Sequence, residues 1–386
     1  MALKLKFTRS LLIMLLCINV ISAQTIYEEF QSRKLGESRQ LKIQLPRNYD
    51  KNVDKTYPLF IVLDGDYLFE AVAGNVDYYS YWDDMPEAII VGVNQLDTRE
   101  VDCYYSEQNY MPIKTGASFF EFLSMELIPH IIGAYRTADF RVAIGHGETA
   151  NFINYYLFKD SPIFQAYMAI SPDFAPGMIE NISERLKQIK TKSFYYLATS
   201  NNDIKPLKED ANSLNTNLAE VENKQLIYGF DEFEGPTHYS LPAYAIPKAL
   251  ESIFFVFQPI SKKEYKERVL TLETSPVKYL NEKYAMINEL FGLKKQVLIN
   301  DFKAISAAIE KNKKFQYYEA LGKLARKEYP DTLLGNYYLA RFYEEEGQPK
   351  KAMKTYRSAY ILEEVAGITK DLMLDKANAI KADFGY

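Results

Sequence analysis

The chain has 386 residues, of which 47% are hydrophobic, and it carries a formal net charge of -5. That length provides for one large domain and a smaller one. The negative charge disfavours a nucleic-acid partner. With three dispersed histidines and two cysteines, we expect no metal centre, and no motif indicates a cofactor.

The first residues, MALKLKFTRSLLIMLLCINVISAQ, combine three basic side chains, an apolar run over Leu11–Val20 and small residues at Ser22 and Ala23. This pattern predicts a secretory signal peptide over residues 1–23. A lipid anchor at Cys17 is the alternative, which the bulky residues before it disfavour. Removal of three positive charges takes the net charge from -5 to -5 - 3 = -8. We therefore expect an exported bacterial protein, periplasmic or secreted, with no internal disulfide and no membrane span in the mature chain.

From Leu41 to Gln258, apolar strand-like runs alternate with segments of helical periodicity. Several runs are apolar throughout, as in strands that are covered on both faces. The alternation predicts an α/β fold, a mostly parallel sheet with helices on both faces, whose functional groups lie at the carboxyl ends of the strands. The expected strands are LKIQLP, YPLFIVLDGD, AIIVGVNQL, RVAIGH, FQAYMAISP, SFYYLATS and KQLIYGF, and the expected helices include SFFEFLSMELIPHIIGAY, ETANFINYYLF, ISERLKQIK and KEDANSLNTNLAEV.

The chain changes character after Pro259, where charged segments begin, and no strand is expected after Val277. NYYLARFYEEEGQPKKAMKTYRSAYIL has the spacing of a tetratricopeptide helix pair, and a degenerate copy precedes it over residues 300–330. An ordinary antiparallel helical hairpin is the alternative. We predict domains over residues 24–260 and 261–386, the second all-helical and a binding surface for another protein.

The stretch RVAIGHGETANFINYYLF, Arg141–Phe158, predicts a buried strand, a sharp turn and a helix. In α/β-hydrolases the catalytic serine lies in the middle of such a turn. Gly147 stands at that place here. Glycine adopts the bent backbone more easily than any other residue, so the turn is kept while the attacking hydroxyl is missing.

Five landmarks in order resemble the esterase D family of α/β-hydrolases, which includes siderophore esterases. They are LPRNYDKNVDKTYPLFIVLDGDYLF, ELIPHIIGAYRT, RVAIGHGETANFINYYLF, FQAYMAISPDF and FEGPTHYSLPAYAIPKALESIFFVF, and they span most of residues 41–258. The family reads G-H-S-x-G-G at the third of these. The sequence keeps Gly145 and His146 but departs at Gly147, Thr149 and Ala150.

The resemblance implies roles for other residues. His238 stands at the position of the family's catalytic base, and Asp203 at that of its acid partner. The oxyanion donors would be the N–H of Glu148 and one near Gly65 or Asp66.

Structural readings remain open for the same residues. A loop aspartate before a helix, such as Asp203, is equally an N-cap, and Asp210 lies further along that helix. His146 is shared with the family motif without being its base, and His130 is expected only to pack. Ser171 matches a structural landmark, and Thr149 should point away from the base.

Two functional hypotheses from different classes follow. One is a pseudo-esterase that binds a small ester-like ligand or a protein partner. The other is a working hydrolase in which His238 or Glu148 activates water, with the aromatic segment VDYYSYWDDMP at the cleft mouth. A purely structural role of the sheet as a platform is a third possibility.

Overall fold

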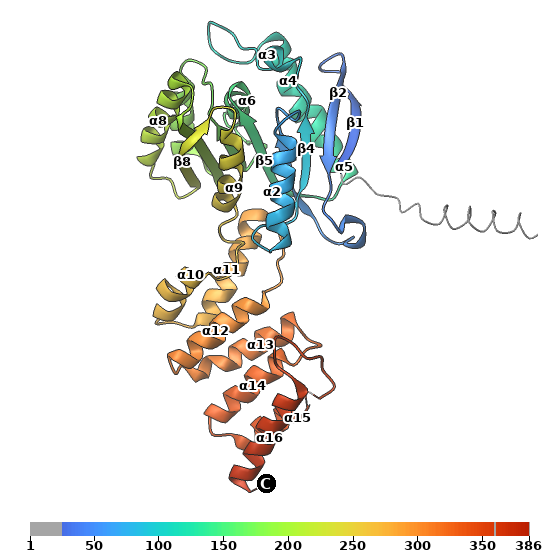
Figure 1. Cartoon of the computed structure of the whole chain (residues 1–386), viewed down its shortest axis with the longest axis vertical. Helices are drawn as coiled ribbons and strands as arrows, with labels where there is room; N and C mark the ends of the chain where they lie inside the picture. Colours follow the sequence, from blue (N-terminus) through green and yellow to red (C-terminus); the bar gives the residue numbers. More distant parts are fainter. Residues whose placement is uncertain (1–24, 359, 386) are drawn as a thin grey trace, which may run out of the picture. The chain divides into compact units, whose positions relative to one another are not determined.

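The computed structural model of the chain describes residues 25–358 and 360–385, drawn in colour in Figure 1. The predicted signal peptide and Cys17 lie outside the described residues. The chain divides into two compact units. The first contains the described residues up to Asp77, Glu87–Thr137 and Arg141–Pro247, and the second contains Tyr78–Pro86, Ala138–Phe140 and the described residues from Lys248. The domain boundary at residues 260 and 261 stays a prediction.

Among the described residues, eight strands form one sheet in the order β1-β2-β4-β3-β5-β6-β7-β8. The pairs β1 with β2 and β2 with β4 are antiparallel, and all later pairs are parallel. The strands are β1 Thr25–Gln31, β2 Ser38–Gln44, β3 Tyr57–Val62, β4 Ile89–Val93, β5 Thr137–His146, β6 Ala166–Ile170, β7 Ser193–Asn202 and β8 Leu226–Thr237.

Every residue of β3, β4 and β6 is buried, because helices cover both faces of the parallel part of the sheet. This confirms the fold class predicted from the sequence. Strand β1 was not predicted, since its sequence TIYEEFQ is largely polar and its side chains are half-exposed or exposed. It pairs along only one edge, with β2.

The helices between the strands follow the expected order. Helix α2 was not predicted, because we read part of its sequence as a segment of a cleft mouth. The helical elements as far as α9 are the 3-10 turn Tyr49–Lys51, α2 Phe69–Tyr81, α3 Arg99–Asp102, α4 Lys114–Glu121, the π-helical turn Phe122–Leu127, α5 Ile128–Ala134, α6 Glu148–Phe152, the 3-10 turn Ile153–Tyr156, α7 Met178–Gln188, α8 Lys205–Ala219 and α9 Leu241–Ile253.

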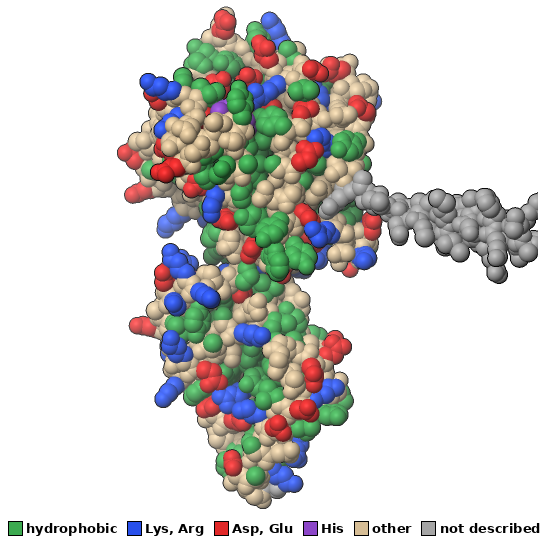
Figure 2. Space-filling view, in the orientation of Figure 1, with side chains coloured by type: hydrophobic (Ala, Val, Ile, Leu, Met, Phe, Trp, Pro, Cys, Tyr) green, Lys and Arg blue, Asp and Glu red, His purple; other side chains and the backbone are tan. Residues whose placement is uncertain are grey.

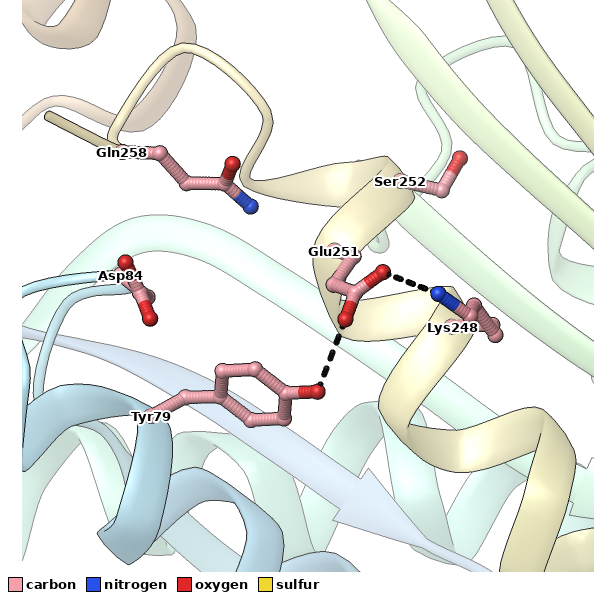
Figure 3. Close-up of a pocket in the computed structure, with 6 residues that line it drawn as sticks. All are labelled: Tyr79, Asp84, Lys248, Glu251, Ser252 and Gln258. Carbon is pink, nitrogen blue, oxygen red and sulfur yellow. Dashed lines mark hydrogen bonds and ion pairs between the residues drawn. The ribbon is translucent and has the colours of Figure 1, made fainter. Parts of the chain in front are cut away.

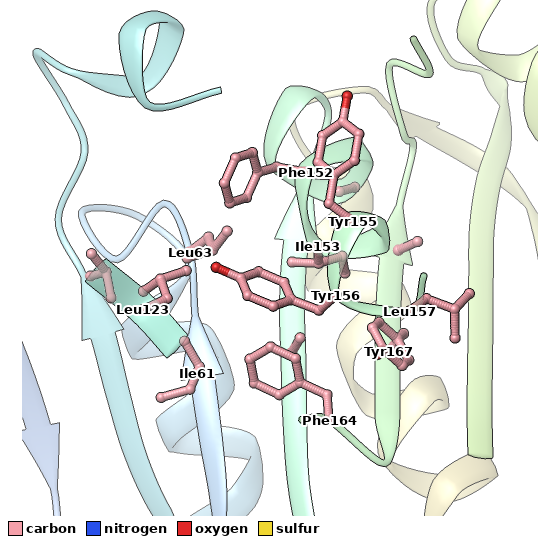
Figure 4. Packing of buried hydrophobic residues seen from close by; sticks show 14 of the residues in the cluster. Ile61, Leu63, Leu123, Phe152, Ile153, Tyr155, Tyr156, Leu157, Phe164 and Tyr167 are labelled. Atoms are coloured by element: carbon pink, nitrogen blue, oxygen red, sulfur yellow. The ribbon is translucent and has the colours of Figure 1, made fainter. Parts of the chain in front are cut away.

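Aromatic side chains fill the core between the sheet and these helices. In Figure 4 the rings of Tyr156 and Phe164 point toward Ile61 of β3. Tyr156 is 1% exposed, and its hydroxyl donates to the carbonyl of Phe120 at 2.9 Å. A buried tyrosine needs such an acceptor, so part of the tyrosine-rich composition serves core packing.

From Lys248 onward, the described part of the second unit is mainly helical (Figure 1). Gly322 lies where α13 meets α14, and a Cβ on it would be 2.6 Å from Leu339 Cγ and 3.0 Å from the Gly335 carbonyl oxygen. Glycine is therefore needed for the two helices to pack this closely. The helices are α10 Lys262–Glu267, α11 Pro276–Phe291, α12 Ile299–Lys311, α13 Tyr318–Glu328, α14 Leu334–Glu345, α15 Pro349–Ser358 and α16 Lys370–Phe384.

The surface carries both signs of charge. Acidic and basic side chains are interspersed over the face of the molecule shown in Figure 2. No helix within residues 25–358 and 360–385 combines the length and the apolar character needed to cross a bilayer.

Gly145 holds the end of β5 against the next helix. A Cβ there would lie 2.5 Å from the carbonyl carbon and oxygen of Thr149, so we expect Gly145→Ala to lower the free energy of unfolding by about 1–3 kcal/mol or more. Gly74→Ala is the matched control, because open space surrounds Gly74 in α2 and alanine is the better helix former, by about 0.5–1 kcal/mol. Chemical denaturation followed by circular dichroism compares the two, and equal losses would contradict this account.

Candidate functional site

The turn that follows β5 lies at the carboxyl end of a central strand, between β3 and β6. Its residue Gly147 is buried and has φ 62° and ψ -121°, a backbone conformation that side chains other than glycine adopt only with strain. The N–H of Gly147 donates to the Ile170 carbonyl at 3.1 Å, and its own carbonyl accepts from the N–H of Asp173 at 3.0 Å. The segments after β5 and β6 are thereby tied together around the turn.

His238 and Asp203 follow the last two strands of the sheet. His238 comes directly after β8 and Asp203 directly after β7, so parallel pairing brings them to one edge. His238 Nδ1–H donates to Asp203 Oδ1 at 2.9 Å. This leaves the Nε2 atom of a neutral imidazole as a hydrogen-bond acceptor.

Asp203 is held by several donors besides the histidine. Its side chain is fully buried, and it accepts from the Thr199 hydroxyl at 2.9 Å and from the Ile204 N–H at 2.8 Å. Burial raises the pKa of Asp203, but hydrogen bonds from His238, Ser171, Ile204 and Thr199 outweigh burial, so that the pKa is lowered. The carboxylate is therefore ionised at neutral pH and fixes the orientation of the imidazole.

The imidazole faces Gly147, the residue at which the resemblance to the esterase family places the nucleophile. A Cβ added to Gly147 would lie 3.8 Å from His238 Nε2 and 3.9 Å from His238 Cε1. A serine hydroxyl attached to that Cβ would come within hydrogen-bond reach of Nε2. Ser171 Oγ lies on the other side of the ring, 2.9 Å from Nδ1, so it cannot serve as the attacking group for the same base. The catalytic roles of His238 and Asp203 stay predictions.

Arg99, which the sequence did not single out, reaches the same turn from α3. Its Nη2 donates to the His146 carbonyl at 2.6 Å and lies 3.1 Å from the position that a Cβ of Gly147 would take. Its Nε donates to Asp64 Oδ1 at 2.7 Å. A guanidinium group thus lies directly beside the position of the missing side chain.

Asp64 is the buried anchor of this arginine. It follows β3, has φ 52° and is 2% exposed. Its carboxylate also accepts from the Thr149 hydroxyl at 2.6 Å and the Tyr67 hydroxyl at 3.1 Å. Burial raises the pKa of Asp64, and Arg99 opposes this shift without cancelling it. Burial alone would lower the pKa of Arg99, but Asp64 outweighs it and raises that pKa.

The ring of His146 stacks on the ring of His238, with ring centroids 4.3 Å apart. Its Nε2–H donates to the His238 carbonyl at 3.2 Å, and its Nδ1 lies 2.9 Å from the Tyr67 hydroxyl. Burial, together with His238 and Arg99, lowers the pKa of His146 to about 3. His146 therefore stays neutral at physiological pH and positions its neighbour.

The predicted oxyanion donors differ in their surroundings. The N–H of Gly65 donates to the Val93 carbonyl at 2.8 Å, so this donor already has an acceptor. Asp66 accepts from the Gln95 N–H at 2.6 Å through its side chain. The N–H of Glu148 opens α6, and the first N–H groups of a helix have no acceptor inside the helix.

The carboxyl group of Glu148 is half-buried beside the turn. Burial raises its pKa, Arg99 lowers it and Asp173 raises it, with a raised pKa as the result. Thr149, by contrast, points to Asp64 and away from His238, as its position in the helix predicts. Asp210 lies within α8, further along the helix that follows Asp203.

Two other predicted features lie apart from this site. His130 Nε2 pairs with Glu28 at 2.9 Å and its ring packs on Phe30. The aromatic segment of residues 76–86 contributes Tyr79 to a pocket lined by residues of the second unit, where its hydroxyl donates to Glu251 (Figure 3). Neither His238 nor Gly147 lines that pocket. Within the described chain, no group of three or more histidine, cysteine or acidic side chains could hold a metal ion.

The comparisons with known proteins bear on this geometry. A model of the family described as "Putative esterase" matches residues 32–193. Residues 32–193 are therefore homologous to this esterase family. An uncharacterised protein from Capnocytophaga ochracea DSM 7271 is 32% identical over 93% of this chain and 100% of its own, with a TM-score of 0.84. A search of curated proteins found no match.

Two more distant structures share the fold of this esterase homologue. The IroE-like serine hydrolase from Shewanella oneidensis is 20% identical over 78% of this chain and 99% of its own, with a TM-score of 0.59. The siderophore hydrolase EstA from Aspergillus nidulans is 14% identical over 62% of this chain and 96% of its own, with a TM-score of 0.52. At these identities the likeness concerns the fold alone.

The sequence reasoning missed Arg99, Asp64 and Tyr67. Asp64 belongs to the LDGD that closes a predicted strand, and its position at a strand end was a usable signal. Arg99 stands in no motif, so only the packing of α3 on the turn reveals it.

The buried His146 makes stability depend on pH. Its pKa of about 3 in the folded chain lies below the ordinary value of about 6.5. The unfolded chain therefore binds the proton first, and stability falls as the pH drops below about 6.5, by up to about 1.4 kcal/mol per pH unit. We expect His146→Gln to flatten this slope between pH 6 and 4. Imidazole NMR shifts of His146 should stay constant from pH 8 to 5, and a titration midpoint in that range would contradict the assignment.

Proposed function

We propose that this protein is a pseudo-esterase, an esterase homologue that binds at the former catalytic centre and cleaves esters poorly or not at all. The observation that supports the proposal most directly is glycine at the nucleophile position, in a turn conformation that suits glycine. Beside it, His238 and Asp203 keep the hydrogen bond by which an acid partner orients a catalytic histidine. They lack a hydroxyl to activate.

The rate accelerations of intact and damaged serine hydrolases favour a pseudo-esterase. Serine hydrolases that lose one member of the triad keep only about 10³ to 10⁴-fold acceleration over water. Working enzymes reach about 10⁶-fold or more. Binding and the hydrogen-bond donors of the site account for the remaining effect. We expect the ligand to be a small ester-like molecule.

A working hydrolase that uses water is the second candidate. The observation in its favour is the orientation of His238 Nε2, which faces the turn at Gly147 and is free to accept a proton. The half-buried Glu148, with its raised pKa, is a second carboxyl group at the same place. Either group could act as a general base on water.

Hydrolysis of short-chain p-nitrophenyl esters separates the two candidates. We expect wild type to turn over these esters at least about a thousandfold more slowly than the usual 1–10³ s⁻¹, with no further loss in His238→Ala. The same esters should still bind, as saturation-transfer NMR can detect. His130→Ala is the control, since His130 lies apart with Glu28. Rapid turnover that disappears in His238→Ala alone would support the water-based hydrolase.

For the second unit we propose protein binding through tetratricopeptide-like helix pairs. The support is the succession of helices in which α14 packs on α13 and α15, and α15 on α16. Buried Ala340, Ala352 and Tyr356 lie at the positions that the repeat spacing predicts. The proposed export, to the periplasm or beyond, rests on residues 1–23, and N-terminal sequencing of the mature protein tests it.

Site-specific photocrosslinking in the full chain tests the protein partner. Ile361 and Met286 are 88% and 42% exposed in the second unit, and Val53 is 64% exposed in the first. A photoreactive residue at either of the first two positions should capture the same polypeptide in cells, and one at Val53 should not. Capture of that polypeptide from all three positions, or from none, would contradict a binding role of the helices.

A further inference from the structure

The space beside Gly147 is occupied by Arg99. Gly147 is buried, and a Cβ on it would meet Arg99 Nη2 at 3.1 Å before any other atom outside the turn. Ordinary van der Waals contacts of such a carbon begin at 3.4 Å. The next atom, His238 Nε2, is 3.8 Å away and leaves room. Besides the positive φ of the turn, the steric obstacle to a side chain at position 147 is therefore the arginine, which would have to yield by a few tenths of an ångström.

Arg99 cannot easily give way. Its Nε and Nη2 hold the two carboxylate oxygens of Asp64 at 2.7 and 3.3 Å, and Nη2 also donates to the His146 carbonyl at 2.6 Å. Asp64 is 2% exposed, so displacement of the guanidinium leaves a buried carboxylate without its cation. A shift of Nη2 by the few tenths of an ångström that the Cβ needs strains these contacts, and removal of the cation from the buried carboxylate is costly. The arginine is fixed by the same contacts that place it beside the turn.

We propose that Arg99 is a positioning residue that blocks the nucleophile position, so that the site is a latent serine esterase two substitutions away from activity. This inference rests on the proposed pseudo-esterase function. Serine at position 147 is not sufficient by itself, because its Cβ and hydroxyl compete with Arg99 Nη2 for the same space.

With serine present and the arginine absent, the remaining groups can complete the reaction. The serine Oγ bonds to the ester carbonyl carbon while its proton moves to His238 Nε2. The alcohol oxygen then leaves with that proton, and an acyl-serine remains. Water, deprotonated by the same Nε2, attacks the acyl carbon, and the proton returns to Oγ as the acid departs. Asp203, already bonded to Nδ1, stays ionised throughout.

The experiment measures p-nitrophenyl butyrate turnover and labelling by a fluorophosphonate probe in full-length variants. We expect Gly147→Ser to stay within about tenfold of wild type and the double variant Gly147→Ser with Arg99→Gln to gain about 10²- to 10⁴-fold, the contribution of a positioned general base. The probe should label only the double variant, at position 147 by mass spectrometry. Adding His238→Ala should abolish both signals, and Gly147→Ala with Arg99→Gln, which lacks the hydroxyl, should show neither.

Loss of Arg99 can itself destabilise the chain through the buried Asp64. Gly147→Ser with Arg99→Ala and Asp64→Asn removes both partners of the ion pair and serves as the second test. Equal activity of Gly147→Ser alone and of the double variant would overturn the inference while the pseudo-esterase proposal stands. The inference would also be overturned if the double variant and the triple variant both fold but neither reacts with the probe. Rapid His238-dependent turnover by wild type would instead refute the proposed function.

Discussion

Parallel strand pairing places the carboxyl ends of β3 and β5–β8 at one edge of the sheet, and the candidate site depends on this constraint. Asp64, Gly147, Ser171, Asp203 and His238 each come shortly after a different one of these strands. Residues far apart in the chain therefore converge without a dedicated scaffold. The buried apolar strands fix their register, so the positions of these five residues are properties of the core as much as of the site.

Two buried carboxylates divide the site into halves with opposite electrostatic balance. Burial raises the pKa of both, but in Asp203 the hydrogen bonds led by that from His238 prevail, whereas in Asp64 burial prevails over Arg99. Asp203 orients the imidazole of His238. Asp64 holds a cation beside the missing nucleophile. One half thus holds a hydrogen-bonded histidine, and the other half holds an ion pair.

The sequence predicted much of this architecture. Continuous apolar runs identified the parallel strands because burial on both faces imposes that pattern, while the polar β1 gave no such signal. Gly147 and the residues that become neighbours of His238 were found through the ordered landmarks. Arg99 was not, because its role depends on how the four-residue helix α3 packs on the turn, and no local spacing encodes such a contact. The hydrogen bond from the Gly65 N–H to the Val93 carbonyl is likewise visible only in the folded structure.

The 3.1 Å spacing between Arg99 and the absent Cβ also constrains the order of events in descent. If the ancestor carried the serine of its family and Arg99 blocks position 147 as proposed, the arginine took its present place beside the turn after the side chain at position 147 had gone. On that proposal, the ion pair with Asp64 would from then on disfavour the return of serine. Such entrenchment turns a reversible point mutation into a one-way step, and a lineage that has passed it is free to select the fold for other uses.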